Sequence, residues 1–328
     1  MKDYIVRKIK RKTKKGYTYE YYDKKNTKVN EAIVKRCLEG IYIPPAHDDV
    51  KINLNNKDKV RAIGYDVKGR AQYVYNKSFK EKQSKSKFKH MIKFGESYIK
   101  IFKQINEDLY TERDSKNNQI AAVLKIVIDC NFRIGNDKYS KENKSYGVTT
   151  LENRHIKVKK DTVTIDFIGK KGVRNTCKVR NKKLSKNLRK KKKTIRKNDR
   201  VFSYRVKNRY YNVKSSDVNK YLKQFGNFTA KNFRTWGANI ELISHLIQQE
   251  QEESETKKKK QVADALKIVA EKLHNTPSVC RSNYIDPYLI DVFMKDTKRF
   301  YSTFRGSPTK EDITEGFLTL LKHNTTNS

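Results

Sequence analysis

The spacing of the apolar residues changes between residues 76 and 90, and this change constrains the fold more than any other feature. Before it, short alternating segments such as Gly16 to Tyr22 are typical of half-buried strands. After it, apolar residues recur every three or four positions, as in His90 to Leu109 and Asn118 to Cys130, which predicts amphipathic helices. We therefore expect an α+β chain with a small N-terminal antiparallel β-sheet domain and a larger, mainly helical domain.

The segment 76–90, which is rich in lysine and serine, separates these two patterns. It is either a linker or a first basic helix, and we place the domains at 1–78 and 79–328. Local patterns then predict a helix at 30–39, a hairpin at 60–75, a strand at 161–168, a basic helix or loop at 181–197, helices at 229–247 and 261–273, and a charged connector at 248–260.

The chain carries a large excess of positive charge. Its 328 residues include 76 Lys and Arg against 36 Asp and Glu, a formal net charge of +40. Such an excess favours a nucleic-acid partner, because basic side chains release the counterions condensed on a polyanion. No run of about 18 apolar residues is present and the N-terminus has no apolar signal region, so we expect neither a membrane span nor secretion.

The four cysteines, Cys37, Cys130, Cys177 and Cys280, are widely scattered. They show no spacing typical of a zinc site, and we expect no bound metal. We expect all four to be reduced thiols that pack as small hydrophobic side chains.

A tyrosine and several upstream cations could together cut and reseal a phosphodiester bond. The Tyr284 phenol can act as a nucleophile, and its phosphate ester conserves the energy of the broken bond. Arg133 and Arg234 can bind the charged oxygens of the transition state through their planar guanidinium groups. Lys170 follows a predicted strand at an exposed hairpin tip and can donate a proton to the leaving oxygen, although the pattern alone does not separate it from Lys171.

Six motifs extend this arrangement in order along the chain. They are Ile43-Pro-Pro-Ala; the segment 64–75; Arg133-Ile-Gly-Asn followed by 145–155; Phe167-Ile-Gly-Lys; Phe233-Arg-Thr-Trp-Gly-Ala-Asn; and Asn275-Thr-Pro-Ser-Val-Cys-Arg-Ser-Asn-Tyr. With these motifs, the chain resembles the short type IB DNA topoisomerases of poxviruses, other large DNA viruses and bacteria. Its abundance of Lys, Asn, Ile and Tyr indicates an AT-rich genome, and a large DNA virus would fit as its source.

The resemblance implies a role for each residue of the constellation. Tyr284 would form a 3′-phosphotyrosyl intermediate, Arg133 and Arg234 would stabilise the transition state, and Lys170 would be the general acid with Lys231 as a helper.

A further family position lies nine residues before the tyrosine and is histidine in poxvirus enzymes and asparagine in many bacterial-like ones. Here it is Asn275, which can donate a hydrogen bond to a phosphate oxygen. His274 is one residue out of register and is not expected to be catalytic.

The resemblance also implies DNA contacts outside the catalytic residues. Gln72, Tyr73 and Tyr75 would lie on a strand that enters the major groove, although either tyrosine alone could equally be a core residue. Tyr139 would belong to a helix that contacts the site from the other side. Asn136 stands in the same region where the poxvirus pattern has lysine, which argues against the poxvirus pentapyrimidine cleavage preference.

The activity implied is relaxation of supercoiled double-stranded DNA by a monomer that closes as a clamp around the duplex. It would need neither ATP nor a metal cofactor, and a divalent cation would at most stimulate it. The location would be intracellular, in the virion, host cytoplasm or nucleus.

Two other functions deserve comparison with this one. A tyrosine recombinase shares the chemistry, but usually has histidine three residues before the second arginine, where this chain has Lys231. A non-catalytic basic architectural protein would explain the charge but not six ordered motifs.

Overall fold

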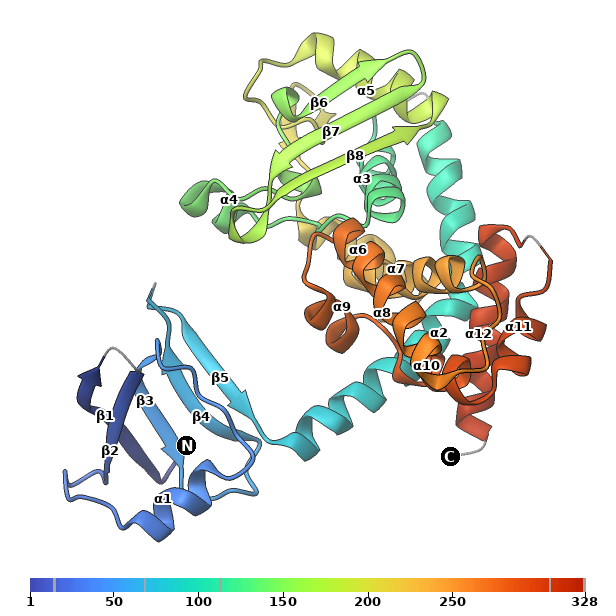
Figure 1. Cartoon of the computed structure of the whole chain (residues 1–328). Coiled ribbons are helices and arrows are strands. Elements are labelled where there is room, and N and C mark those ends of the chain that lie inside the picture. The colour runs from blue at the N-terminus through green and yellow to red at the C-terminus, as the bar shows by residue number, and fades with distance from the viewer. Residues whose placement is uncertain (14–15, 68, 112–113, 307, 327–328) are drawn as a thin grey trace. The chain divides into compact units, whose positions relative to one another are not determined.

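The computed structural model describes residues 1–13, 16–67, 69–111, 114–306 and 308–326, which divide into two compact units (Figure 1). The first unit is Met1–Phe88 and the second is Lys89–Ser328. Helix α2 (Lys77–Tyr110) includes the lysine- and serine-rich segment and continues past residue 88. Of the two interpretations of this segment, the structure therefore shows the helix.

The first unit is built on a five-stranded antiparallel sheet with the strand order β2-β1-β3-β4-β5. Helix α1 (Glu31–Leu38) begins after Asn30, whose side chain accepts a hydrogen bond from the Ala32 amide, and it contacts β3. The helix predicted at 30–39 and the hairpin predicted at 60–75 are confirmed. The strands are β1 (Tyr4–Thr13), β2 (Gly16–Tyr22), β3 (Asp48–Asn53), β4 (Val60–Tyr65) and β5 (Ala71–Tyr75).

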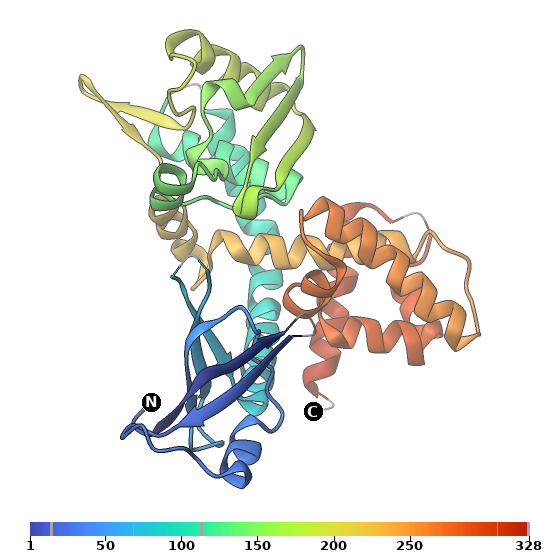
Figure 2. The same ribbon diagram turned by 60° about the vertical axis from the view of Figure 1, so that its left-hand side comes forward.

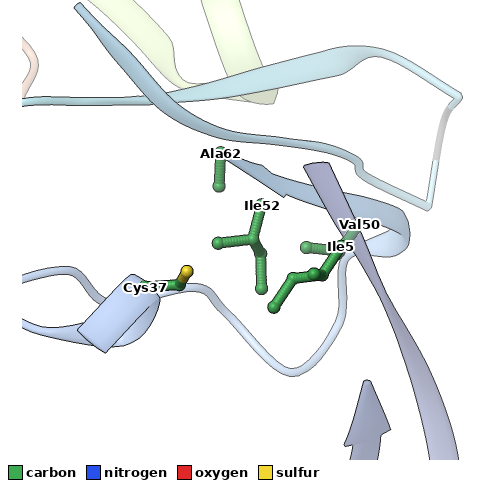
Figure 3. Packing of buried hydrophobic residues seen from close by; sticks show 5 residues of the cluster. All are labelled: Ile5, Cys37, Val50, Ile52 and Ala62. Carbon is green, nitrogen blue, oxygen red and sulfur yellow. The ribbon is translucent and has the colours of Figure 1, made fainter. Parts of the chain in front are cut away.

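A small hydrophobic core joins helix α1 to this sheet (Figure 3). Its buried members are Ile5, Cys37, Val50, Ile52 and Ala62, each at most 1% exposed. Burial of these side chains is the main term that stabilises so small a unit.

A buried arginine attaches the proline-containing loop to the sheet. Arg7 is 9% exposed, and its guanidinium donates hydrogen bonds to the carbonyls of Pro44 at 3.2 Å and His47 at 2.7 Å. The Ile43-Pro-Pro-Ala motif is therefore held in a defined position beside β1.

The second unit contains a three-stranded antiparallel sheet and a group of helices (Figure 1). The sheet consists of β6 (Ile156–Lys159), β7 (Thr162–Ile168) and β8 (Arg174–Arg180), which confirms the strand predicted at 161–168. Helix α3 (Lys116–Cys130) contacts β8, and helix α5 (Lys182–Thr194) contacts β6 and β7. The basic segment at 181–197 is therefore largely a helix, with Asn181 as its N-cap.

Helix α7 (Ala230–Leu246) is the central helix of this unit, because it contacts α3, α8 (Glu255–Lys272) and α12 (Lys310–Thr326). Its Trp236 is 1% exposed and packs against Phe94 and Phe317. Figure 2 shows the two-stranded hairpin β9–β10 projecting from the same unit. Among the described residues of this unit, the remaining elements are α4 (Asp137–Asn143), β9 (Ser203–Val206), β10 (Arg209–Asn212), α6 (Ser215–Leu222), α9 (Pro277–Asn283), α10 (Pro287–Lys295), α11 (Thr297–Thr303) and four short 3₁₀ turns.

The charged connector predicted at 248–260 is only partly correct, because α8 already begins at Glu255. Ser254 caps the helix by accepting a hydrogen bond from the Lys257 amide, and Glu255 pairs with Lys259 at 2.6 Å. An acidic residue in the first turn and an i, i+4 ion pair both favour a helix here, even though the segment lacks apolar residues.

The prediction of four reduced cysteines is wrong for two of them. Cys130 and Cys177 form a disulfide between α3 and β8, whereas Cys37 and Cys280 are buried free thiols, as expected. The sequence separation of 47 gave no local signal of this pairing. Closing such a loop restricts the unfolded chain, which in the chain-entropy model stabilises the fold by about 4 kcal/mol.

Within the described ranges, none of the helices has the length and apolar character needed to cross a membrane.

Candidate active site

One cavity of about 900 Å³ in the second unit gathers the predicted catalytic residues. Its wall comes from the loop after α3, the β7–β8 turn, the start of α7 and the α8–α9 segment. Lys171, the alternative to Lys170, and His274, the neighbour of Asn275, also line it. The six predicted residues that line it are Arg133, Lys170, Lys231, Arg234, Asn275 and Tyr284.

Tyr284 lines this cavity as the C-cap residue of the short helix α9. Thr276 is the N-cap of this helix, and its side chain accepts a hydrogen bond from the Val279 amide. Pro277 occupies the first turn, where proline is favoured. The Tyr284 amide donates to the Cys280 carbonyl at 2.9 Å, so the tyrosine remains fixed to the helix.

Asn239 on α7 fixes the backbone of Tyr284 from the other side, a role that the sequence analysis missed. Its side-chain amide donates to the carbonyls of Thr235 at 2.8 Å and Tyr284 at 2.9 Å, and its oxygen accepts from the Asp286 amide at 2.8 Å. Asn239 is 1% exposed and ends the Phe233-Arg-Thr-Trp-Gly-Ala-Asn motif, so the motif itself was the available signal.

Arg234 lies against the tyrosine ring, with its Cζ atom 5.4 Å from the ring centroid of Tyr284. The arginine is 4% exposed, and one Nη atom donates to the Leu273 carbonyl at 3.2 Å. Its Nε and second Nη atoms are buried and have no hydrogen-bond partner within the described residues. A buried cation with two unused donors is an arrangement that a bound anion would satisfy.

Arg133 and Asn275, which also line the cavity, are hydrogen-bonded to each other. An Nη atom of Arg133 donates to Oδ1 of Asn275 at 2.9 Å. Since a guanidinium can only donate, the amide oxygen must face it, and Nδ2 faces elsewhere. That Nδ2 atom is buried and lacks a partner among the described residues, which gives the site another unused donor.

The backbone conformation at the end of α8 explains why Asn275, and not His274, contacts Arg133. His274 adopts a left-handed conformation with φ of 50°, which terminates the helix and turns the chain. Its ring packs on Phe132 with centroids 5.7 Å apart. Burial lowers the pKa of His274, and the charges of Arg234 and Arg133 lower that pKa further, so the imidazole stays neutral near pH 7.

Two glycines position the loop that carries Arg133. The Arg133 carbonyl accepts from the Val148 amide at 3.0 Å, which pairs the loop with residues 147–149. Gly135 has φ of 97°, and a Cβ atom on Gly147 would lie 2.4 Å from the Gly135 Cα atom. Both positions of this motif therefore require glycine.

Lys170 and Lys171 form the exposed turn between β7 and β8. The Gly169 amide closes the turn by donating to the Val173 carbonyl at 2.8 Å, and Lys171 has φ of 66°. Both lysines line the cavity, so their location alone does not separate them. Lys231 is exposed and lies one helical turn before Arg234, which places it on the same side of α7.

The positive charges around Tyr284 change its acidity. Burial would raise the pKa of this phenol, but the nearby charges of Arg234, Arg133 and Lys231 outweigh burial and lower the pKa below its ordinary value. A lower pKa increases the phenolate fraction at any pH below it, which makes the oxygen a better nucleophile.

The lowered pKa can be measured directly. In protein labelled with ¹³C at the tyrosine ζ carbons, the signal absent from Tyr284→Phe should titrate below the value of about 10 of an exposed phenol. Lys231→Met should move this titration to higher pH, because one stabilising charge is lost. A Tyr284 titration at or above 10 in the wild-type chain would contradict the electrostatic account.

The predicted DNA-contact residues of the first unit lie on two faces of β5. Tyr73 and Tyr75 stack on each other with centroids 6.1 Å apart, and Tyr73 is 51% exposed, so Tyr73 is not a core residue. Gln72 is on the opposite face with the partly buried Val74, and its amide donates to Asp66 at 3.0 Å.

The predicted contacts of the second unit lie on helix α4. Asn136 caps this helix: its side-chain oxygen Oδ1 accepts a hydrogen bond from the Lys138 amide, so that oxygen is already engaged. Tyr139 is 54% exposed. Arg200 pairs with Asp137 at 2.7 Å and so anchors the helix at its first turn.

Within the part of the chain that the structure describes, no cluster of three His, Cys, Asp or Glu side chains could hold a metal ion.

Comparison with known proteins identifies the family. A model described as eukaryotic DNA topoisomerase I, catalytic core, matches residues 76–299. The chain is 31% identical over 305 residues to DNA topoisomerase 1B of Acanthamoeba polyphaga mimivirus, covering 89% of each protein. It is 26% identical over 232 residues to DNA topoisomerase 1B of vaccinia virus strain Copenhagen, covering 70% of this chain and 71% of the relative. The chain therefore belongs to the type IB DNA topoisomerases and is similar to the short mimivirus and poxvirus enzymes.

Proposed function

We propose that this topoisomerase relaxes supercoiled duplex DNA through attack of the Tyr284 phenol oxygen on a backbone phosphorus. The bond from phosphorus to the 5′ oxygen breaks, and the 3′ phosphate stays on Tyr284 as an ester. The cut strand rotates around the intact one, and the free 5′ hydroxyl then attacks the ester and restores the strand. Because the ester conserves the bond energy, no nucleotide is consumed.

The observation that carries this proposal is the set of buried donors beside Tyr284. The Nε and Nη atoms of Arg234 and the Nδ2 atom of Asn275 lack partners among the described residues, and all belong to residues that line one cavity. A phosphate in that cavity would accept from them, and charge that develops on its oxygens would be stabilised most in the transition state.

The roles of the cations follow from their burial. Arg234 is buried and Arg133 is half-buried and hydrogen-bonded to Asn275, so both are suited to hold fixed phosphate oxygens. Lys170 is exposed on a hairpin turn, where it can approach the 5′ oxygen and donate its proton. Lys231, one helical turn from Arg234, adds positive charge beside the bound phosphate.

DNA contacts are proposed for both units, with the duplex held in a clamp by a monomer. The exposed side chains of Tyr73 and Tyr139 are suited to donate a hydroxyl hydrogen bond to a phosphate or to pack on a thymine methyl group. Further contacts are proposed for Tyr75 and Gln72 of β5 and for Asn136, the N-cap of α4. The net charge of +40 supports affinity for the DNA backbone. Since its substrate is cellular or viral DNA, we infer an intracellular site of action.

A plasmid assay tests the function. The purified chain should relax supercoiled plasmid in EDTA without ATP, because neither a metal nor a nucleotide enters the proposed steps. Product analysis should show a ladder of topoisomers. Relaxation that stops in EDTA would contradict the metal-independent mechanism, and the absence of relaxation in every buffer would contradict the function.

A further inference from the structure

The disulfide between Cys130 and Cys177 joins the two segments that carry Arg133 and Lys170. Cys130 is the last residue of α3, and Arg133 follows three residues later. Cys177 lies in β8, and the turn of the same hairpin holds Lys170. The bridge therefore restricts the position of the proposed general acid relative to one of the proposed phosphate-binding arginines.

Two non-covalent contacts accompany the bridge at this junction. Phe132 packs edge-to-face on Phe167, with ring centroids 5.0 Å apart. The Tyr146 amide donates to the Ile168 carbonyl at 2.9 Å. These contacts keep the hairpin beside the Arg133 loop if the bridge opens, but they permit more movement than a covalent link. We expect opening to loosen the active site without unfolding the unit.

The two cysteines of the bridge differ in exposure. Cys177 is half-buried, whereas Cys130 is only 3% exposed, so a small thiol would attack the Cys177 sulfur. The free thiols are less reactive, because both are fully buried. Burial raises the pKa of Cys280 to about 11 and also raises the pKa of Cys37, which leaves little thiolate near pH 7.

We propose that Cys130 and Cys177 form a redox modification site that low-molecular-weight thiols open and their disulfides close, and that the closed form cleaves DNA faster. The inference rests on the proposed roles of Arg133 and Lys170. Disulfides in intracellular proteins are commonly transient or redox-sensing, and an enzyme of intracellular DNA meets such thiols where it acts.

The exchange is balanced in atoms and electrons. A thiolate attacks the Cys177 sulfur, the protein disulfide bond breaks, and Cys130 leaves as a thiolate that takes up a proton. A second thiol then attacks the mixed disulfide and releases Cys177. Two small thiols thus supply two electrons and two protons and become one small disulfide, and the reverse reaction closes the bridge.

The test measures single-turnover DNA cleavage by the full chain after equilibration with reduced and oxidised glutathione. Alkylation and mass spectrometry report the state of Cys130 and Cys177 in each sample. We expect the oxidised form to cleave about tenfold faster, which is within the roughly hundredfold loss that a 1 Å misplacement can cause.

Variants and a modified substrate locate the effect. Cys130→Ala and Cys177→Ala should each cleave at the slow rate in both buffers, whereas Cys37→Ala should keep the redox dependence. A DNA with a 5′-bridging phosphorothiolate needs no proton from Lys170, so the difference between oxidised and reduced protein should shrink on this substrate. A purely structural bridge would give the same ratio on both substrates.

The outcomes separate this inference from the proposed function. Equal cleavage rates by the oxidised and reduced wild-type chain would overturn the redox site and leave the topoisomerase mechanism intact. A bridge that glutathione cannot open while the chain stays folded would also overturn the proposal. The absence of cleavage in both states would instead contradict the mechanism on which the inference rests.

Discussion

Tyr284→Phe is expected to bind supercoiled plasmid as the wild-type chain does and to leave it fully supercoiled. The substitution removes only the phenol oxygen, so the ring can keep its place 5.4 Å from the Arg234 guanidinium. Without that oxygen no ester to DNA can form, and the loss of relaxation should be complete. Gel mobility shift measures binding, plasmid relaxation measures activity, and a denaturing gel with labelled DNA measures the covalent adduct.

Tyr288→Phe is the matched control. Tyr288 lies four residues further along, is half-buried at the start of α10, and does not line the cavity. Its variant should relax plasmid at the wild-type rate. If Tyr284→Phe relaxed plasmid, or if Tyr288→Phe alone lost activity, the assignment of the nucleophile would be wrong.

Lys170→Ala is expected to slow DNA cleavage by about 10²–10⁴-fold, the usual contribution of a general acid. The 5′ oxygen leaves poorly without a proton, whereas sulfur leaves readily without one. A substrate with a 5′-bridging phosphorothiolate should therefore restore most of the rate. The measurement is single-turnover cleavage of both substrates by the variant and by the wild-type chain.

Lys171→Ala provides the comparison on the same turn. Both lysines are exposed and line the cavity, but only one is proposed to donate the proton. Lys171→Ala should slow cleavage less, and to the same degree on both substrates. If Lys171→Ala cleaved slowly and the phosphorothiolate substrate restored its rate, Lys171 would be the general acid. If Lys170→Ala cleaved slowly and that substrate did not restore its rate, Lys170 would be rejected as the acid.

Local patterns in the sequence were sufficient for many individual elements. The β-branched alternation at 161–168 predicted β7, and the apolar spacing in 229–247 predicted α7. These features depend on neighbours along the chain, which is why periodicity reveals them. The motifs likewise named the residues that line the cavity, because each motif is short and contiguous.

Features that depend on contacts between distant segments were missed. The bridge between Cys130 and Cys177 requires the end of α3 to meet β8, and nothing near either cysteine indicates this. The role of Asn239 depends on the approach of Tyr284, which is 45 positions away.

The most direct test of the mechanism is to identify the amino acid that becomes linked to DNA. The wild-type chain is trapped on a nicked or short duplex during cleavage, digested with protease and nuclease, and analysed by mass spectrometry. The account predicts one modified peptide, with a 3′-phosphoryl nucleotide on Tyr284. A nucleotide on any other residue, or one attached through its 5′ phosphate, would contradict it.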